Sequence, residues 1–421
     1  MDEQLQDLVN RTADRLGLQQ YELARHSIFR QTNTFHETVY ILNMEWFPNH
    51  VQESGENFNP AGTAVVEVDI HSHQVRQLIF SEGVTFEENK NLPSSDKEDA
   101  IEWVEKMTGL EFGRQFRLVD EQADTLYFQA AVDNVPVYPS GTIELRFDEE
   151  GNLILFSVDG TFPDEEHIRW EPFNLTTDKT GQTAEEQVKL MEIPLEEETR
   201  WLPVYGLNTV FLTNDASRTI SFEEVEKHLT YVGKDTLLEW NQPAEEEFAE
   251  EEVDFSLEVT EKQALENEMD PDTQPLTETD QAKAVEEAVY FLQRVYPEGS
   301  GTWRLAGIYR QNGYIFADLK GAETTNKVVE RKIRLILDKD DLHAVSYLDN
   351  QVIVDIFQQF EPAEQTRLST EESYQKLKDH VDVTPVYVYE ASQEKYILCG
   401  KIASDYGVDA VTGEVISLNE L

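Results

Sequence analysis

The chain of 421 residues is poor in cysteine and has no long apolar run. Its one cysteine, Cys399, excludes an intramolecular disulfide, and the apolar run Tyr396 to Cys399 favours a buried side chain over a reactive thiol. No apolar run approaches the ~20 residues that a membrane-spanning helix needs. The N-terminus, Met1 to Gln4, lacks the basic and apolar regions of a signal peptide, so we expect a soluble cytoplasmic protein.

Positive charge is also scarce. The chain has 34 Lys and Arg against 84 Asp and Glu, which gives a formal net charge of -50. This field repels a phosphate backbone, so nucleic acid is not expected as a partner. The same field attracts cationic proteins, peptides or metal ions. Adaptation to salt or to an alkaline medium also explains the charge and is favoured over a specific basic partner, and both interpretations stay open.

Signatures of catalysis are missing too. The chain has no Walker loop, no dinucleotide-binding glycine fingerprint and no Gly-x-Ser-x-Gly elbow. His36-Glu37 stands without the second histidine of a zinc hydrolase motif. Carboxylates are so abundant that no pair of them specifies a general acid and base. We therefore expect a protein that is not an enzyme, with no catalytic, cofactor-binding or metal-binding residues.

The chain does contain an internal repeat. Residues Ile143 to Asp148 return as Ile333 to Asp338, and the match continues to Pro203-Val204-Tyr205 and Pro385-Val386-Tyr387. A weaker third copy places Val65 to Asp69 against Glu144 to Asp148. Such self-similarity predicts tandem copies of one supersecondary unit.

Within each copy, a helix precedes several strands. Apolar spacing predicts helices over residues 2–16 and 96–106, with Ser94 and Ser95 as N-cap candidates for the second. β-branched and aromatic runs predict strands at 38–46, 63–68, 116–120, 125–132, 142–147 and 153–158. Short connections favour antiparallel pairing, so we predict an α+β fold of tandem units, each with a helix packed on an antiparallel sheet.

The predicted boundaries divide the chain into four parts. They are a degenerate N-terminal α+β copy (1–92), a first long unit (93–240), an acidic linker (241–278) and a second long unit (279–421). Acidic blocks in the linker repel themselves, which favours a flexible or weakly helical segment. The alternative is a docking tail for a basic partner, anchored by Phe248, Phe255 and Leu257.

Asp69, His71 and His73 form the strongest candidate metal site, because alternate residues of a strand face one way and these side chains bind metals. The repeat aligns them with Asp148 to Asn152 and with Asp338 to Asp341, which are typical of polar hairpin tips. We therefore interpret all three segments as turns.

For the tryptophans near repeat positions, core packing is favoured over a ligand cage. These residues are Trp103, Trp170, Trp201, Trp240 and Trp303.

The segment Tyr406 to Val415 resembles the Val-Asp-Ala-x-Thr-Gly-Glu signature of PepSY and PepSY-like domains. It predicts a strand, a turn at Thr412-Gly413 and a returning strand, with Gly413 free to adopt positive φ. Val135 to Tyr138 resembles the Gly-Val-Pro-Val block of PepSY-type protease propeptides, with Asn134 in place of the glycine. The long units are most similar to the YcdB/YcdC repeat family of bacilli, over most of residues 95–421.

This resemblance implies small PepSY-like, cystatin-like modules that bind or inhibit proteases, and it implies no catalytic residues. It also implies an extracytoplasmic or membrane-associated protein, whereas the N-terminal sequence favours a cytoplasmic one. Two segments depart from the family pattern: Asp215 to Arg218 lacks the Thr-Gly-Glu turn, and Ala322-Glu323-Thr324 replaces the Val-Pro-Val block.

Three functions are compatible with these observations. The first is a non-enzymatic binding or regulatory protein that holds a protein or peptide, basic or a protease, by pairing with exposed strand edges. The second is a structural scaffold without a specific ligand. The third is an enzyme of unrecognised type, whose site would combine residues that break the repeat.

Overall fold

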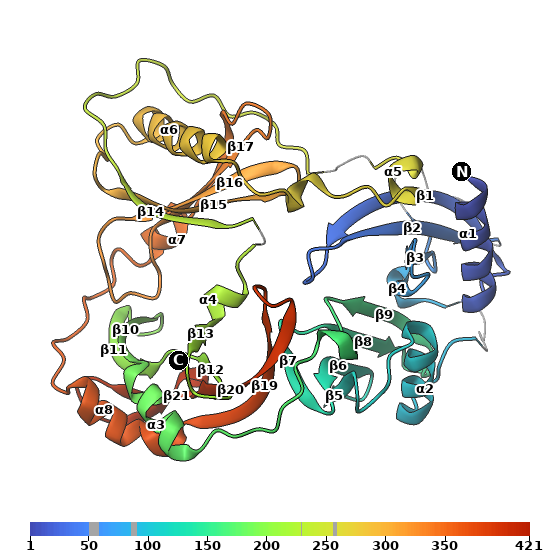
Figure 1. Ribbon diagram of the computed structural model, residues 1–421, viewed down its shortest axis with the longest axis horizontal. Coiled ribbons are helices and arrows are strands. Elements are labelled where there is room, and N and C mark those ends of the chain that lie inside the picture. The colour runs from blue at the N-terminus through green and yellow to red at the C-terminus, as the bar shows by residue number, and fades with distance from the viewer. Residues whose placement is uncertain (50–58, 86–90, 229, 256–258) are drawn as a thin grey trace. The chain divides into compact units, whose positions relative to one another are not determined.

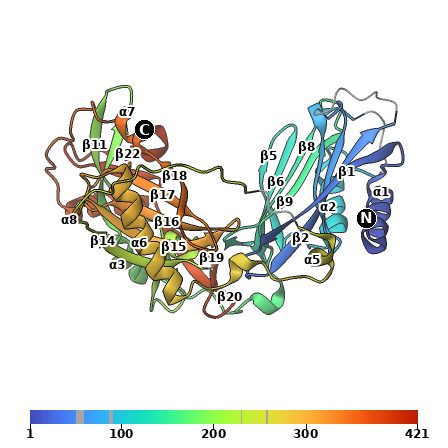
Figure 2. The same ribbon diagram turned by 90° about the horizontal axis from the view of Figure 1, so that it is seen from above.

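A computed structural model describes residues 1–49, 59–85, 91–228, 230–255 and 259–421 (Figures 1 and 2). It has the predicted α+β class, with helices packed on sheets that are almost entirely antiparallel. The chain forms two compact units, of which the first holds residues 1–171, 258–270 and 386–398 and the second holds the rest. The boundaries predicted at 92, 240 and 278 remain predictions.

The first unit contains a sheet in the order β1-β2-β3-β4-β9-β8-β6, with β5 and β7 also paired to β6. Its helices are α1 (Glu3–Leu16), η1 (Ser81–Gly83), α2 (Lys97–Thr108), η2 (Glu165–His167) and α5 (Glu261–Leu265). Its strands are β1 (Tyr21–Thr32), β2 (Thr38–Pro48), β3 (Ala64–Asp69), β4 (Val75–Phe80), β5 (Phe116–Glu121), β6 (Thr125–Val132), β7 (Val135–Tyr138), β8 (Thr142–Phe147) and β9 (Leu153–Asp159).

One face of this sheet carries the core of the first unit, covered by α1 and α2 (Figure 1). Leu5, Leu8 and Leu16 recur at helical spacing along α1 and are buried there, as are Val104 and Met107 of α2. The α2 cap differs from the prediction, because Asp96 and neither serine accepts the hydrogen bonds of the first backbone N–H groups.

Strand β1 was not predicted from the sequence. Its twelve residues, YELARHSIFRQT, mix charged and polar side chains with apolar ones, and most of them are exposed or half-buried. The strand lies at the edge of the sheet, and β2 is its one strand partner in the part of the chain that the structure describes. An edge strand has little need of buried side chains, so periodicity indicates it poorly.

The second unit has one five-stranded sheet, in the order β14-β15-β16-β17-β18, and one four-stranded sheet, in the order β10-β11-β21-β22. Its helices are α3 (Thr177–Glu186), α4 (Phe222–Val225), η3 (Pro271–Thr273), α6 (Glu278–Val295), α7 (Gln351–Ile356), α8 (Thr370–Leu377), η4 (Lys378–His380) and η5 (Leu418–Glu420). Its strands are β10 (Val188–Leu195), β11 (Arg200–Leu207), β12 (Val210–Thr213), β13 (Thr219–Ser221), β14 (Val232–Leu238), β15 (Trp303–Gln311), β16 (Tyr314–Gly321), β17 (Lys332–Leu337), β18 (Ala344–Asp349), β21 (Tyr406–Asp409) and β22 (Val415–Ser417). Strands β19 (Asp382–Glu390) and β20 (Lys395–Ala403) contribute residues to both units.

Two of the hydrophobic cores in the second unit are covered by helices. Helix α6 packs across the five-stranded sheet, where Ala284, Ala288, Phe291 and Leu292 are buried (Figure 1). Helices α3 and α8 enclose the other core with β10, β11, β12 and β21. Cys399 is buried in β20, in agreement with the prediction of a buried side chain.

The same order of elements, a helix followed by four strands, recurs along the chain. It occurs as α1 with β1–β4, α2 with β5, β6, β8 and β9, α3 with β10–β13, α6 with β15–β18, and α8 with β19–β22. The α3 and α8 copies exchange their second hairpins, because β11 pairs with β21 whereas β20 pairs with β12. Among the described residues, no helix combines the length and apolarity needed to cross a bilayer.

Candidate functional site

The most regular polar feature of the fold is an aspartate at the turn between the third and fourth strand of each copy. Its Oδ1 atom accepts hydrogen bonds from backbone N–H groups of residues that lie two to four positions further along the chain. The aspartates are Asp69, Asp148, Asp215, Asp338 and Asp409. A short side chain that caps its own turn is a structural device. The Val-Asp-Ala-x-Thr-Gly-Glu segment is one of these turns, with Gly413 at φ 76° as predicted.

The structure places the first predicted candidate site at one of these turns. Asp69 caps the turn, and His73 has the positive φ that Leu342 and Gly413 have in the equivalent positions. His71 turns its Nε2 atom to the carbonyl oxygen of Ala264 at 2.9 Å. The three side chains therefore have separate roles, and they do not form a cluster of metal ligands among the described residues.

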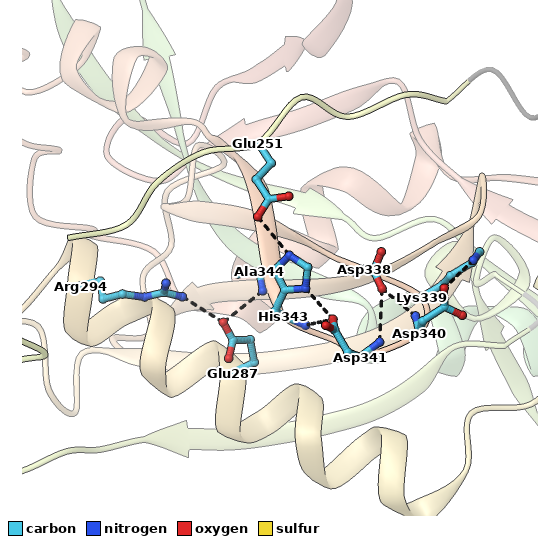
Figure 3. Close-up of polar contacts among 9 residues, drawn as sticks. All are labelled: Glu251, Glu287, Arg294, Asp338, Lys339, Asp340, Asp341, His343 and Ala344. Carbon is cyan, nitrogen blue, oxygen red and sulfur yellow. Dashed lines mark hydrogen bonds and ion pairs between the residues drawn. The ribbon is translucent and has the colours of Figure 1, made fainter. Parts of the chain in front are cut away.

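Potential metal ligands do gather at the equivalent turn of the α6 copy. One ligand atom each from Asp338, Asp341 and His343 lies within 4.8 Å of the other two (Figure 3). Asp338 caps the turn through the N–H groups of Asp340 and Asp341, at 2.8 and 3.2 Å. Carboxylate and imidazole groups suit several divalent metals, so the donor set is chemically suitable.

Both ring nitrogens of His343 are already engaged by carboxylates. Nδ1 lies 2.5 Å from Asp341 and Nε2 lies 3.1 Å from Glu251 (Figure 3). The hydrogen bond to Asp341 raises the pKa of His343, and Glu251 raises it further. An imidazole that donates from both nitrogens is an imidazolium, which has no lone pair for a metal. In this arrangement His343 joins the turn to the chain segment that carries Glu251.

The surroundings of this turn are held by a second polar contact. Glu287 of α6 accepts a hydrogen bond from the backbone N–H of Ala344 at 3.0 Å and forms an ion pair with Arg294 at 2.9 Å (Figure 3). Both charged side chains are largely buried, so this contact fixes α6 against the start of β18. Local sequence gives no signal for Glu251, Glu287 or Arg294 as members of this site, because their partners are distant in sequence.

The first unit contains a pocket of about 730 Å³, lined by the β1–β2 and β3–β4 turns, the end of α2 and the segment after β9. His36, His71 and His167 line it together with Asp69. Burial lowers the pKa of His36, and the nearby Glu394 raises it, with burial dominant. His167 stacks on Phe35 with ring centroids 4.0 Å apart.

This pocket offers polar groups for binding but no assembled acid and base. Among the described residues, none of its three histidines forms a hydrogen bond to a carboxylate, which would orient the ring for proton transfer. The predicted pair Asp69 and His71 does reach the pocket, whereas His73 is absent from its lining. The sequence indicated only part of this pocket, which is the pair Asp69 and His71. It did not indicate His36 and His167, because they lie in other turns.

The tryptophans are divided between core and surface. Trp103, Trp201 and Trp303 are buried, as core packing predicts. Trp170 is 52% exposed and lines a smaller pocket of about 290 Å³ with Arg114, so the core interpretation was wrong for this residue. Trp240 is half-buried and packs against the core of the five-stranded sheet, and its Nε1 donates a hydrogen bond to the carbonyl oxygen of Pro297.

The acidic segment makes specific contacts in the second unit. Phe248 packs on Phe291 and Tyr347, and Phe255 packs on Tyr314. Leu257, the third predicted anchor, lies outside the described residues. Residues 259–270 of the linker belong to the first unit and contain α5, whereas residues 271–278 belong to the second unit. Both described phenylalanines therefore contact the chain itself in this structure.

Comparison with known proteins gives a weak structural match and no sequence match. No protein family matches the sequence, and no curated protein does. Among solved structures, the Bacillus megaterium YpeB C-terminal domain is similar over 49% of this chain and 86% of that one. The sequences are 9% identical and the TM-score is 0.26. Functional inference for this protein therefore depends on its own residues.

Proposed function

We propose that this protein is a non-enzymatic binding protein that captures an extended segment of another protein or peptide. The observation that supports it most is the open outer edge of β1. A twelve-residue strand is about twice the usual length. Long exposed edges are rare in soluble proteins because they pair with other chains, so an edge of this length favours a strand-binding role.

The backbone contacts of β1 support this role. Its residues pair with β2 from Tyr21↔Pro48 to Thr32↔Thr38, with a shift of register between Leu23 and Arg25. Among the described residues, the outer side of residues 22–32 has no backbone partner. Arg25, His26 and Ser27 are exposed. An incoming strand would find free N–H and C=O groups along this edge without displacing any described element.

Charge and family resemblance narrow the class of partner. The net charge of -50 favours a basic protein over an acidic one, by long-range attraction that weakens as salt screens it. The resemblance to PepSY-like and YcdB/YcdC repeats suggests a protease as that partner. We propose a basic protein, and specifically a protease, as the partner of the β1 edge. Main-chain hydrogen bonds would supply the binding energy, and attraction between opposite charges would speed association.

Paired proline variants test the proposal. Successive residues of a strand point their N–H groups to opposite sides, so one of His26→Pro and Ser27→Pro removes an outward donor and the other breaks the pairing with β2. The variant that keeps the wild-type thermal stability is the outward one. Partners recovered by the immobilised full chain at low and moderate salt should bind this variant about tenfold more weakly.

Two results would contradict the proposed function. One is a full chain that captures no partner above background at either salt concentration. The other is a partner that binds the outward proline variant as tightly as the wild type, which would place binding away from the β1 edge.

A further inference from the structure

We propose that the outer edge of β18, with the aromatic residues beside it, is a second docking site, which takes an extended acidic segment of a partner protein. In this structure, residues 244–255, here called the strap, fill that site. The strap would then be an internal competitor for the partner. This inference uses a different edge and the opposite charge preference from the proposed β1 site, so the two stand independently.

An aromatic side chain anchors the strap. Phe248 packs edge-to-face on Phe291 of α6, at 5.2 Å between ring centroids, and lies 5.8 Å from the ring of Tyr347 of β18. The guanidinium of Arg294 lies 5.0 Å from the centre of the Phe248 ring. These partners form a pocket for one aromatic ring, with a cation beside it.

Carboxylates follow the aromatic anchor. Glu250 accepts a hydrogen bond from the hydroxyl of Ser346 at 2.5 Å, and Glu251 accepts one from His343 at 3.1 Å. Ser346 is nearly buried, whereas His343 is half-exposed. The site therefore recognises an aromatic residue followed two to three positions later by acidic residues.

The strap uses little of the strand edge that it covers. Among the described residues, the N–H of Glu251 to the carbonyl oxygen of Val345, at 2.8 Å, is the one backbone hydrogen bond recorded between the strap and β18. Glu287 occupies the N–H of Ala344. The outer backbone groups of the rest of β18 have no recorded partner from the strap. A regular strand would form more main-chain hydrogen bonds there, and each would add to its affinity.

The acidic composition of the strap also weakens its binding to the site. It carries two blocks of consecutive acids, which are Glu245, Glu246, Glu247, Glu250, Glu251 and Glu252. Like charges at this density repel one another and the rest of an acidic protein. A partner segment that keeps the aromatic anchor and one or two carboxylates, without the other charges, would bind the same contacts at a lower electrostatic cost.

Fluorescence polarisation with a labelled synthetic peptide of residues 244–255 tests the inference on the full chain. In the wild type, the tethered strap competes at an effective concentration on the order of 1 mM, so the peptide should bind weakly. Phe248→Ala in the chain removes the aromatic ring that fills this pocket and leaves the residues that line the pocket unchanged. This variant should bind the peptide about tenfold more tightly than the wild type.

Two controls test whether the peptide binds at this site and whether its sequence order matters. Adding His343→Ala to Phe248→Ala removes a half-exposed side chain of the site with little risk to folding, and should weaken peptide binding again. A peptide of the same composition in scrambled order should not bind. Circular dichroism melts confirm that each variant is folded.

Three results would overturn the inference. The first is equal binding of the peptide by the wild type and the Phe248→Ala chain. The second is equal binding of the scrambled peptide. The third is a wild-type dimer, seen by light scattering at high concentration and lost in Phe248→Ala, which would assign the site to the strap of a second copy and not to a separate partner.

Discussion

At the scale of single residues, one side chain recurs with one role. An aspartate lies at or just past the end of the third strand of each copy and accepts hydrogen bonds from N–H groups of its own turn, as Asp409 does from Val411 and Thr412 at 2.7 and 3.0 Å. The carboxylate reaches these groups because its side chain is short. Asp69 is a potential metal ligand by residue type. In the structure its Oδ1 atom instead accepts hydrogen bonds from the backbone N–H groups of His71 and Ser72.

The turn at Asp409 gives a direct test of this role. Asp409→Ala removes the acceptor for two backbone N–H groups and should lower the free energy of unfolding by about 1 kcal/mol. Asp409→Asn keeps an oxygen in the same place and should cost less. Urea unfolding midpoints measure both. The control is Asp405→Ala, an exposed aspartate nearby for which no side-chain bond is recorded among the described residues, and an equal loss there would contradict the capping role.

At the scale of elements, close backbone approach decides where glycine is needed. Gly233 of β14 and Gly307 of β15 are register partners. The ring of Tyr231 lies over Gly307, so that a Cβ there would come within 2.2 Å of it, whereas a Cβ at Gly233 would be 3.7 Å from the same ring. The hydroxyl of Tyr231 donates to the carbonyl oxygen of Ala306 at 3.1 Å, which holds the ring in place.

These two glycines form a matched pair of substitutions. Gly307→Ala should displace Tyr231 and lower the free energy of unfolding by about 1–3 kcal/mol. Gly233→Ala makes an ordinary contact and should change it by less than about 0.5 kcal/mol. Thermal and urea unfolding provide the comparison. If both variants are equally stable, Tyr231 does not pack on Gly307 in solution.

Several elements of the first unit were predicted from local sequence. The strands at 125–132 and 142–147 have the predicted ends, and the helix at 97–108 differs by a few residues. One element that was not predicted is β1, which carries its charged residues on an open edge. Periodicity reports burial, and an edge strand buries too little to leave that signal.

At the scale of the whole molecule, charge and connectivity dominate. The net charge of -50 opposes any compact state by self-repulsion. The exchange of second hairpins between the α3 and α8 copies ties together segments about 200 residues apart, since β11 pairs with β21 and β12 with β20. Folding of these two copies is therefore interdependent, and neither completes its sheet alone.

Salt should stabilise the protein. Raising sodium chloride from about 10 mM to about 500 mM shortens the screening length from ~30 Å to a few ångströms, which reduces repulsion among the acidic side chains. We expect the melting temperature to rise by on the order of 5 °C. Scanning calorimetry measures it, with a neutral osmolyte as the control. A melting temperature that falls as salt is added would argue against adaptation to salt.

The sequence by itself determined what depends on near neighbours. The repeat, the α+β class and the turn at Thr412-Gly413 follow from spacing and local hydrogen bonding, and the structure has all three. Only the tertiary structure decided which hairpin completes which sheet, and that Glu251 meets His343 and Phe248 meets Tyr347. Such contacts join residues about 100 to 200 positions apart, where local pattern carries no information and packing selects the partner.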